Sequence, residues 1–398
     1  MNSSDKTSQY KKLGVDPTKE NVKEIFEKII DNEYPTAFVN IITDPFNKSR
    51  VMTQHQDGDG SKFIQRLLHY YESGKEEVFD GMVDDALAMN SGDIASSGFV
   101  FEPWLITDVL NLNLESDLKE VVMKRIALRF LGLISLYKKY GFSIKFLGGE
   151  TADLRDQVRS GVFDIAITAW ARRKDLITGN VKPGDAIFGF SSDGQAVWEE
   201  EYNSGIMSNG LTLARSTLMK KSYNKKYLHL KREGAFYKGR FSYKQTKIYP
   251  GIDTISIGNL LLSPTRQWPI VIKELITILK KKKAQSHLHG IVMNTGGGAT
   301  KIKNIGKNIH YFKTMPSIPI FFRIIQEESQ ENWLNMFESF NCGIGLDIVG
   351  KDSPAFRDAL EETSEKTKVD LYRLGQCLKS KKEKNEVSLE TGYGNFNY

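Results

Sequence analysis

Four segments of the chain combine glycine with polar side chains that could bind a phosphate group or a metal ion. The first is Asp57-Gly58-Asp59-Gly60-Ser61-Lys62. Glycine lets a backbone approach a ligand closely, aspartate oxygens suit Mg²⁺, and the Lys62 ammonium could pair with phosphate oxygens. The segment is not a P-loop, because GxxxxGK[ST] occurs nowhere in the sequence. The same residues could equally form an exposed turn.

The second segment is the polar end of a helix that we predict from about Glu77 to Met89. Asp85 and Asp93 lie near one helix face if the helix continues, but Asn90-Ser91-Gly92 could end it first. A carboxylate on an otherwise apolar helix is costly to bury without a partner. Either a metal ion or solvent would therefore have to satisfy it.

Two further glycine segments follow apolar stretches. Gly148-Gly149-Glu150-Thr151 is predicted to be a loop directly after a strand at 144–147. Ligands of open α/β sheets bind beyond the carboxyl ends of strands, so Glu150 is a candidate metal ligand. The loop Thr295-Gly296-Gly297-Gly298 exposes backbone amides that could bind an anion, or it is a flexible connection. Together the four segments indicate Mg²⁺-nucleotide chemistry outside the P-loop class.

Strands and helices must position these segments, and the hydrophobic pattern predicts both. Strands are expected at 163–170, 186–190 and 342–349, and helices at 116–140 and 270–279. Their alternation in both halves indicates an α/β or α+β class. The turn Lys182-Pro183-Gly184-Asp185 is the best boundary between two domains, 1–180 and 181–398. The tail from 351 is expected to hold one helix and a terminal hairpin about Lys384-Asn385.

The composition is that of an ordinary globular protein, which excludes collagen-like, coiled-coil and wholly disordered classes. The 398 residues carry a net charge of +6, too weak an excess to argue for nucleic acid. The only cysteines, Cys342 and Cys377, form no CxxC pair and fit a reducing compartment. The start of the sequence is polar, and no apolar run approaches the ~20 residues of a membrane helix. We therefore expect a soluble, cytoplasmic protein with no membrane and no nucleic-acid partner.

The order and wording of these segments resemble the aminoimidazole ribonucleotide synthetase family, the phosphoribosylformylglycinamidine cyclo-ligases of purine biosynthesis. Any one segment is a weak signal, but nine in the same order are a strong one. The corresponding segments are 10–16, 57–62, 85–94, 148–152, 181–185, 208–210, 262–266, 289–298 and 341–345.

The sequence also departs from the family pattern. Met207 and Met293 stand where the family has histidines, Gly92 stands in place of an asparagine, and 193–206 looks like an insertion. Loss of a histidine removes a possible acid–base group. The resemblance therefore leaves open a paralogue that phosphorylates a different small substrate, or one that binds ATP without turnover.

The resemblance implies a fold of two α/β domains, whose first-domain sheets pair into a barrel in a homodimer. The N-terminal domain would bind ATP and dimerise. The implied reaction uses ATP to activate the amide oxygen of formylglycinamidine ribonucleotide, after which the amidine nitrogen closes the imidazole ring and phosphate leaves. No enzyme nucleophile is required, so catalysis would consist of positioning and charge stabilisation.

The resemblance also implies which residues act. Three carboxylates would hold Mg²⁺ against the ATP phosphates: Asp57, Asp93 and Glu150. Two amines, Lys11 and Lys62, would be positive partners near the nucleotide or its metal carboxylates. Hydrogen bonds to nucleotide or substrate would come from Thr151 and Asn209, and a substrate phosphate would lie on the amides of Gly296, Gly297 and Gly298. Arg266 would be structural or nearby.

Overall fold

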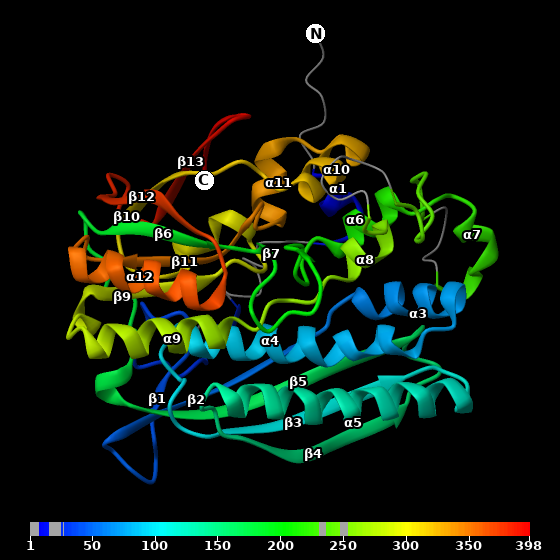
Figure 1. Cartoon of the computed structure of the whole chain (residues 1–398), viewed down its shortest axis with the longest axis horizontal. Helices are drawn as coiled ribbons and strands as arrows, with labels where there is room; N and C mark the ends of the chain where they lie inside the picture. Colours follow the sequence, from blue (N-terminus) through cyan, green and yellow to red (C-terminus); the bar gives the residue numbers. More distant parts are fainter. Residues whose placement is uncertain (1–7, 16–24, 27, 231–235, 247–253) are drawn as a thin grey trace.

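A computed structural model describes residues 8–15, 25–26, 28–230, 236–246 and 254–398. It contains two large sheets with helices between and around them (Figure 1). The first sheet has the order β1-β2-β5-β3-β4, and only β3 and β4 are parallel. Its strands are β1 (Ile42–Thr43), β2 (Arg50–Gly58), β3 (Trp104–Leu112), β4 (Ile144–Asp153) and β5 (Gly161–Arg172).

Helices cover one face of this first sheet. They are α3 (Lys62–Ser73), α4 (Asp80–Ser96) and α5 (Ser116–Lys139), with α4 packed on β2 and β5. Alternate residues of β5 from Phe163 to Ala171 are buried beneath the helices, while those between them, such as Asp164 and Trp170, are partly exposed. The other face of the sheet is therefore uncovered in a single chain.

The second sheet has seven strands in the order β14-β13-β10-β12-β6-β11-β9. They are β6 (Ala186–Ser191), β9 (Leu288–Met293), β10 (Ile309–Thr314), β11 (Ile344–Gly350), β12 (Leu371–Lys379), β13 (Glu386–Thr391) and β14 (Gly394–Asn397). Figure 1 shows α9 (Trp268–Lys281) beside α4 in the middle of the molecule, and α12 (Pro354–Thr367) packs against α9. α9 thus joins the helical layers of the two sheets.

Shorter elements complete the second half around the ends of these strands. They include the small hairpin β7 (Asp193–Gly194) and β8 (Asn203–Ser204), and the helices α6 (Leu211–Leu218), α7 (Tyr223–Lys226), α8 (Ile257–Leu262), α10 (Ile320–Ser329) and α11 (Trp333–Ser339). Among the described residues, no helix is both long enough and apolar enough to cross a membrane.

Most predicted elements are confirmed, and three predictions need correction. The helix expected at 77–89 continues to Ser96, so Asn90-Ser91-Gly92 does not end it. The expected loop at 148–151 is part of β4, which follows β3 as a parallel edge strand through a register shift near Asp108. A terminal hairpin exists, but not about Lys384-Asn385, because β12 and β13 pair with opposite sides of β10. The hairpin is formed by β13 and β14, which pair antiparallel.

Replacement of two glycines by alanine should change the free energy of unfolding in opposite directions. A Cβ on Gly345 of β11 would lie 1.9 Å from the Trp268 ring, whereas one on Gly132 of α5 would meet nothing within 4 Å. Gly345→Ala should lower the free energy of unfolding by about 1–3 kcal/mol through overpacking. Gly132→Ala should raise it by about 0.5–1 kcal/mol, because alanine is the better helix former. Denaturant unfolding of both variants measures this, and an equal effect of the two would contradict the packing described.

Candidate functional site

The candidate site lies where the end of β2 meets α4 and the glycine loop at 295–298. Asp57 pairs with Ile165 of β5, whose side chain is buried beneath the helices, so Asp57 faces α4. The main-chain carbonyl of Asp57 accepts a hydrogen bond of 2.8 Å from Asn90 Nδ2. This bond ties the strand to the helix turn that carries Asp93.

Asp93 is the buried carboxylate of this site. Its Oδ2 atom lies 3.5 Å from His55 Nε2 and 3.8 Å from Lys301 Nζ, while its Oδ1 atom is buried with no hydrogen-bond partner. Burial raises the pKa of Asp93, the charges of Lys301 and His55 lower it, and the Asp57 charge raises it further. Asp57 and Asp93 are therefore within electrostatic reach of each other.

The glycine loop approaches the same carboxylate through Lys301. The Lys301 ammonium also donates a hydrogen bond to Thr295 Oγ1, at the start of the loop. Gly297 and Gly298 have φ angles of 94° and 54°, which glycine adopts without strain. A Cβ on Gly298 would lie 2.4 Å from the Phe340 carbonyl oxygen, so the loop can pack this closely only with glycine there.

Asn209 lies against this loop from the preceding segment of the second half. A Cβ on Gly296 would lie 3.5 Å from Asn209 Oδ1. The Nδ2 atom of Asn209 is buried and has no hydrogen-bond partner within the described residues. A buried amide donor without a partner is costly, so a ligand that accepts a hydrogen bond here would be stabilised.

A buried ion pair supports the loop from behind. Lys313 Nζ lies 2.7 Å from Asp347 Oδ2 and donates to the Ala299 carbonyl at 3.1 Å, while Asn294 Nδ2 donates to the same Asp347 oxygen at 3.0 Å. Asn294 precedes the loop and Ala299 follows it, so the pair holds both ends. Burial raises the pKa of Asp347 and the Lys313 charge opposes that rise.

Glu150 and Thr151 lie apart from this group. Both are exposed on β4, and Glu150 aligns with Val109 of β3. Val109 in turn pairs with Asp164, the strand neighbour of Ile165, so Glu150 is on the face opposite to Asp57. β5 and β3 also separate the two strands. In the described part of one chain, no group of three His, Cys, Asp or Glu side chains could hold a metal ion.

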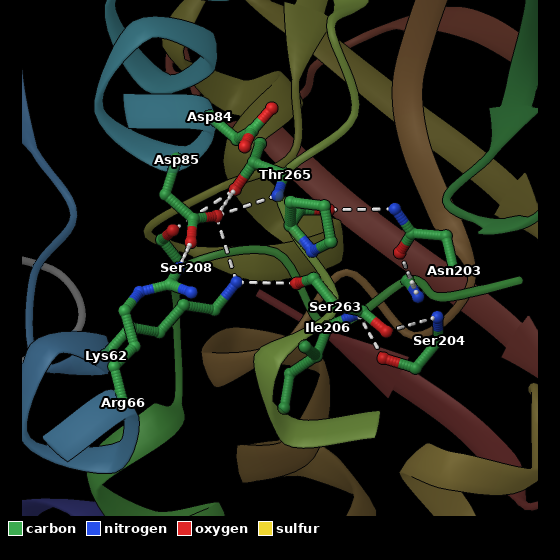
Figure 2. Close-up of polar contacts among 12 residues, drawn as sticks. Lys62, Arg66, Asp84, Asp85, Asn203, Ser204, Ile206, Ser208, Ser263 and Thr265 are labelled. Atoms are coloured by element: carbon green, nitrogen blue, oxygen red, sulfur yellow. Dashed lines mark hydrogen bonds and ion pairs between the residues drawn. The ribbon is translucent and has the colours of Figure 1, made fainter. Parts of the chain in front are cut away.

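Lys62 belongs to a different, fully buried cluster (Figure 2). Its Nζ atom lies 2.9 Å from Asp85 Oδ1 and donates to the Ser263 carbonyl at 2.6 Å. Burial lowers the pKa of Lys62 to about 8, and the Asp85 charge opposes that shift. Lys62 therefore supports the loop that begins at Asp57 and lies against Asp85, on the same helix as Asp93.

Asp85 also accepts hydrogen bonds from Arg66 and Thr265. Arg66 Nη2 lies 2.5 Å from its Oδ2 atom, and both the backbone N–H and the hydroxyl of Thr265 donate to Oδ1 at 2.7 Å (Figure 2). Thr265 belongs to the second half of the chain, whereas Arg66 is on α3. One carboxylate thus joins α3, α4 and the 263–265 segment.

Lys11 and Arg266 lie outside the group around Asp93. Lys11 is exposed on α1 (Gln9–Lys12), whose neighbouring Tyr10 hydroxyl accepts a hydrogen bond from the Gly210 amide. Arg266 is buried, with Nε and Nη2 each 2.9 Å from a Glu199 carboxylate oxygen. Arg266 is thus structural, and it anchors the 193–206 segment through Glu199 and the Asp193 carbonyl.

The two methionines that replace family histidines are both fully buried. Met207 is 1% exposed and Met293 is 0% exposed. A Cβ on Gly92 would lie 2.4 Å from Met293 Sδ. The thioether of Met293 therefore packs directly against Gly92, in the turn of α4 that precedes Asp93, and would have to shift to admit a side chain at 92.

Sequence reasoning missed three residues of the site: His55, Asn90 and Lys301. A signal existed for His55, because it precedes Asp57 by two residues in a strand and so shares its face. Asn90 was treated as a helix terminator. Lys301 was one lysine among many, and only the fold brings it to Asp93.

Removal of the Asp85 carboxylate should be strongly destabilising. Asp85→Ala leaves the Lys62 and Arg66 charges buried without their partner, which typically costs about 3–5 kcal/mol. Asp117→Ala, in the exposed first turn of α5, is the matched control and should change stability by less than about 0.5 kcal/mol. Urea unfolding of the two variants tests this. Equal losses would show that the cluster is not a stabilising junction.

Sequence comparison finds relatives over most of this chain. The chain is 26% identical over 343 residues to the phosphoribosylformylglycinamidine cyclo-ligase of Methanococcus vannielii, covering 86% of this chain and 82% of that protein. It is 32% identical over 274 residues to the one of Pyrococcus furiosus, covering 68% and 65%. For the one of Alkaliphilus metalliredigens, identity is 26% over 382 residues, covering 92% and 91%. A scan of protein-family models gave no match.

Solved structures show the same fold at low sequence identity. A chain of the HypE-HypF complex matches with a TM-score of 0.52 and 14% identity, covering 94% of this chain and 97% of that one. PurL of T. maritima, solved with FGAR, matches with a TM-score of 0.54 and 11% identity, covering 97% and 53%. The expected α/β fold is confirmed, and this chain is a homologue of the phosphoribosylformylglycinamidine cyclo-ligases, which are ATP-dependent ligases.

Proposed function

We propose that this protein is an ATP-dependent cyclo-ligase that closes the imidazole ring of aminoimidazole ribonucleotide from formylglycinamidine ribonucleotide. The observation that carries the proposal is the position of Asp93, which lies beside Lys301 and the glycine loop on the helix that Asn90 bonds to the carbonyl of Asp57. Curated relatives over most of the chain bear the name of this ligase. Carboxylates, an amine and free amides together suit a nucleotide with a divalent cation.

The residues present fit a cation that arrives with the nucleotide. Mg²⁺ usually keeps waters and binds one or two carboxylates together with substrate phosphates, and Asp57 and Asp93 provide such a pair. The buried Asp93 Oδ1 atom, which has no hydrogen-bond partner, is satisfied if a cation is bound. The cation would neutralise charge on the transferred phosphoryl group. Glu150 remains a proposed third ligand that could join only from elsewhere in an assembly.

The protein's own residues would then orient the reactants. Of the three glycines expected to bind a phosphate, Gly298 already donates its amide to the Thr295 carbonyl at 2.8 Å. The amides of Gly296 and Gly297 would therefore bind the phosphate, on a loop supported by Lys313 and Asp347. Lys301 would place its positive charge between that phosphate and Asp93. Asn209 would hydrogen-bond the substrate or nucleotide through its unsatisfied Nδ2. Ring closure is intramolecular, so this positioning supplies much of the rate advantage.

The proposal gives supporting or peripheral roles to Lys11, Lys62 and Thr151. Lys62 would hold the loop that presents Asp57, since its ammonium is bound to Asp85 and Ser263. Lys11 and Thr151 are exposed, and they would reach a nucleotide only at the surface of the site.

A second candidate is a paralogue of the same fold that phosphorylates another small substrate, or binds ATP without turnover. Met207 and Met293 favour it, because both histidine positions of the family pattern are here buried and apolar. The fold is also shared with a chain of the HypE-HypF complex, which bears a different name. A screen for ADP release with small acids, amides and phosphates separates the candidates.

We further propose that the chain consists of two domains, 1–180 and 181–398, and that it forms a homodimer in the cytoplasm. The first sheet lies wholly before the boundary and the second wholly after it. The uncovered face of the first sheet carries apolar side chains, among them Val162 at 41% exposure. Pairing of two such faces would bury them. Cys342 and Cys377 are unpaired thiols, which suits a reducing compartment.

Loss of either site carboxylate should abolish ring closure. Asp57→Asn and Asp93→Asn should each lower kcat/KM at least about 100-fold. Each change removes a negative charge that would hold the cation bound to the transferred phosphoryl group. Asp117→Asn is the charge-matched control on an exposed helix turn and should keep full activity. The assay follows ADP and aminoimidazole ribonucleotide, and complementation of a strain that lacks the cyclo-ligase supports it. Near wild-type rates in both variants would refute the assignment.

A charge placed on the uncovered face of the first sheet should dissociate the proposed dimer. The protein should sediment as a dimer at micromolar concentration, and Val162→Glu should shift it to monomer by placing a charge in the buried face. Leu131→Glu changes a residue that is 67% exposed on α5, outside that face, and should leave the dimer intact. Analytical ultracentrifugation distinguishes these outcomes. A wild-type monomer at that concentration would contradict the proposed assembly.

A further inference from the structure

His55 is the one imidazole that faces the site carboxylates in the described residues. It lies two residues before Asp57 on β2, and its side chain is 24% exposed. Its Nε2 atom is 3.5 Å from Asp93 Oδ2. None of the functions assigned above uses this ring.

Asn90 determines which ring nitrogen of His55 carries the proton. The Asn90 Nδ2 atom donates to three backbone carbonyls, those of Asp57 at 2.8 Å, Ile165 at 2.8 Å and Ala86 at 3.1 Å. These acceptors fix the orientation of the amide, so its Oδ1 atom is the one that lies 2.9 Å from His55 Nδ1. A carbonyl oxygen can only accept, hence Nδ1 bears the hydrogen.

The other nitrogen, Nε2, then presents a lone pair to a carboxylate oxygen in the neutral ring. Two lone pairs repel each other unless a cation lies between them. The 3.5 Å separation is longer than a usual N–H···O hydrogen bond, which spans about 2.7–3.2 Å. It suits two ligands of one metal ion, each about 2.0–2.2 Å from it.

His55 also has a hydrogen-bond acceptor for its second ring nitrogen, as metal-binding histidines usually do. Such histidines usually donate their second ring N–H to an acceptor that fixes the tautomer, and Asn90 Oδ1 does so here. Asn90 itself is fully buried. Beside the ring, the buried Asp93 Oδ1 atom has no hydrogen-bond partner, so this oxygen is free to bind a cation.

We propose that His55 Nε2 is a nitrogen ligand, together with the Asp93 carboxylate, of the divalent cation that enters with the nucleotide. The inference rests on the proposed function, since that function brings the cation. No three protein side chains of the described residues form a complete cage, so phosphate oxygens and water complete the shell. An imidazole ligand favours first-row transition ions, and the site therefore prefers Mn²⁺ over Mg²⁺.

Pulsed electron paramagnetic resonance of the full chain with Mn²⁺ and a non-hydrolysable ATP analogue tests this directly. The wild-type spectrum should show coupling of Mn²⁺ to a ¹⁴N nucleus that becomes ¹⁵N coupling when the protein is labelled with [¹⁵N]histidine. His55→Ala should lose the coupling, and its preference for Mn²⁺ over Mg²⁺ should fall about tenfold. His310→Ala, on β10 of the second sheet, is the control and should change neither.

The outcomes separate the two proposals. Mn²⁺-nucleotide binding without histidine coupling would overturn the nitrogen ligand and leave the proposed function standing; it would indicate an imidazolium paired with Asp93 instead. Absence of Mn²⁺-nucleotide binding by the wild-type protein would overturn both. The isotope-labelled wild type decides the question even if His55→Ala folds poorly.

Discussion

A carboxylate removed from water must be given other partners, and the architecture of this protein depends on how Asp85 is satisfied. Two cationic side chains from α3 and two donors of Thr265 surround it. The two donor segments come from different halves of the chain, so one buried anion sets their position relative to α4. Asp93 is on the same helix as Asp85, which means that this junction also places the functional carboxylate.

Buried polar groups recur behind the site, bound by both backbone and side-chain partners. Asn90 bonds carbonyls of β2, β5 and α4 with one amide group. Lys313 and Asp347 hold the two sides of the glycine loop from within the second sheet. Unpaired groups at these depths would cost several kcal/mol, so each network admits essentially one arrangement. Rigid support of this kind suits a reaction in which the enzyme positions reactants and supplies no nucleophile.

Met293 packs against Gly92, in the helix turn that carries Asp93. A Cβ on Gly92 would lie 2.4 Å from the Met293 sulfur, so the flexible end of Met293 would have to shift to admit a side chain there. In the same neighbourhood, His55 and Asn90 form a hydrogen-bonded pair on the side of Asp93 that faces the strand. The surroundings of Asp93 thus combine an imidazole from the strand with an apolar thioether packed on the same helix.

The sequence by itself determined the class of elements, the order of the motifs and the family, because periodicity and short glycine segments are local properties. It predicted Asp57 and Asp93 as metal ligands, and in the structure Asn90, on the same helix as Asp93, bonds the carbonyl of Asp57. Tertiary structure alone decided that Lys62 faces Asp85, that Glu150 lies on the other face of the sheet, and that His55 and Lys301 belong to the site. Strand register, burial and long-range pairing decide which side chains meet, and a linear pattern does not contain them.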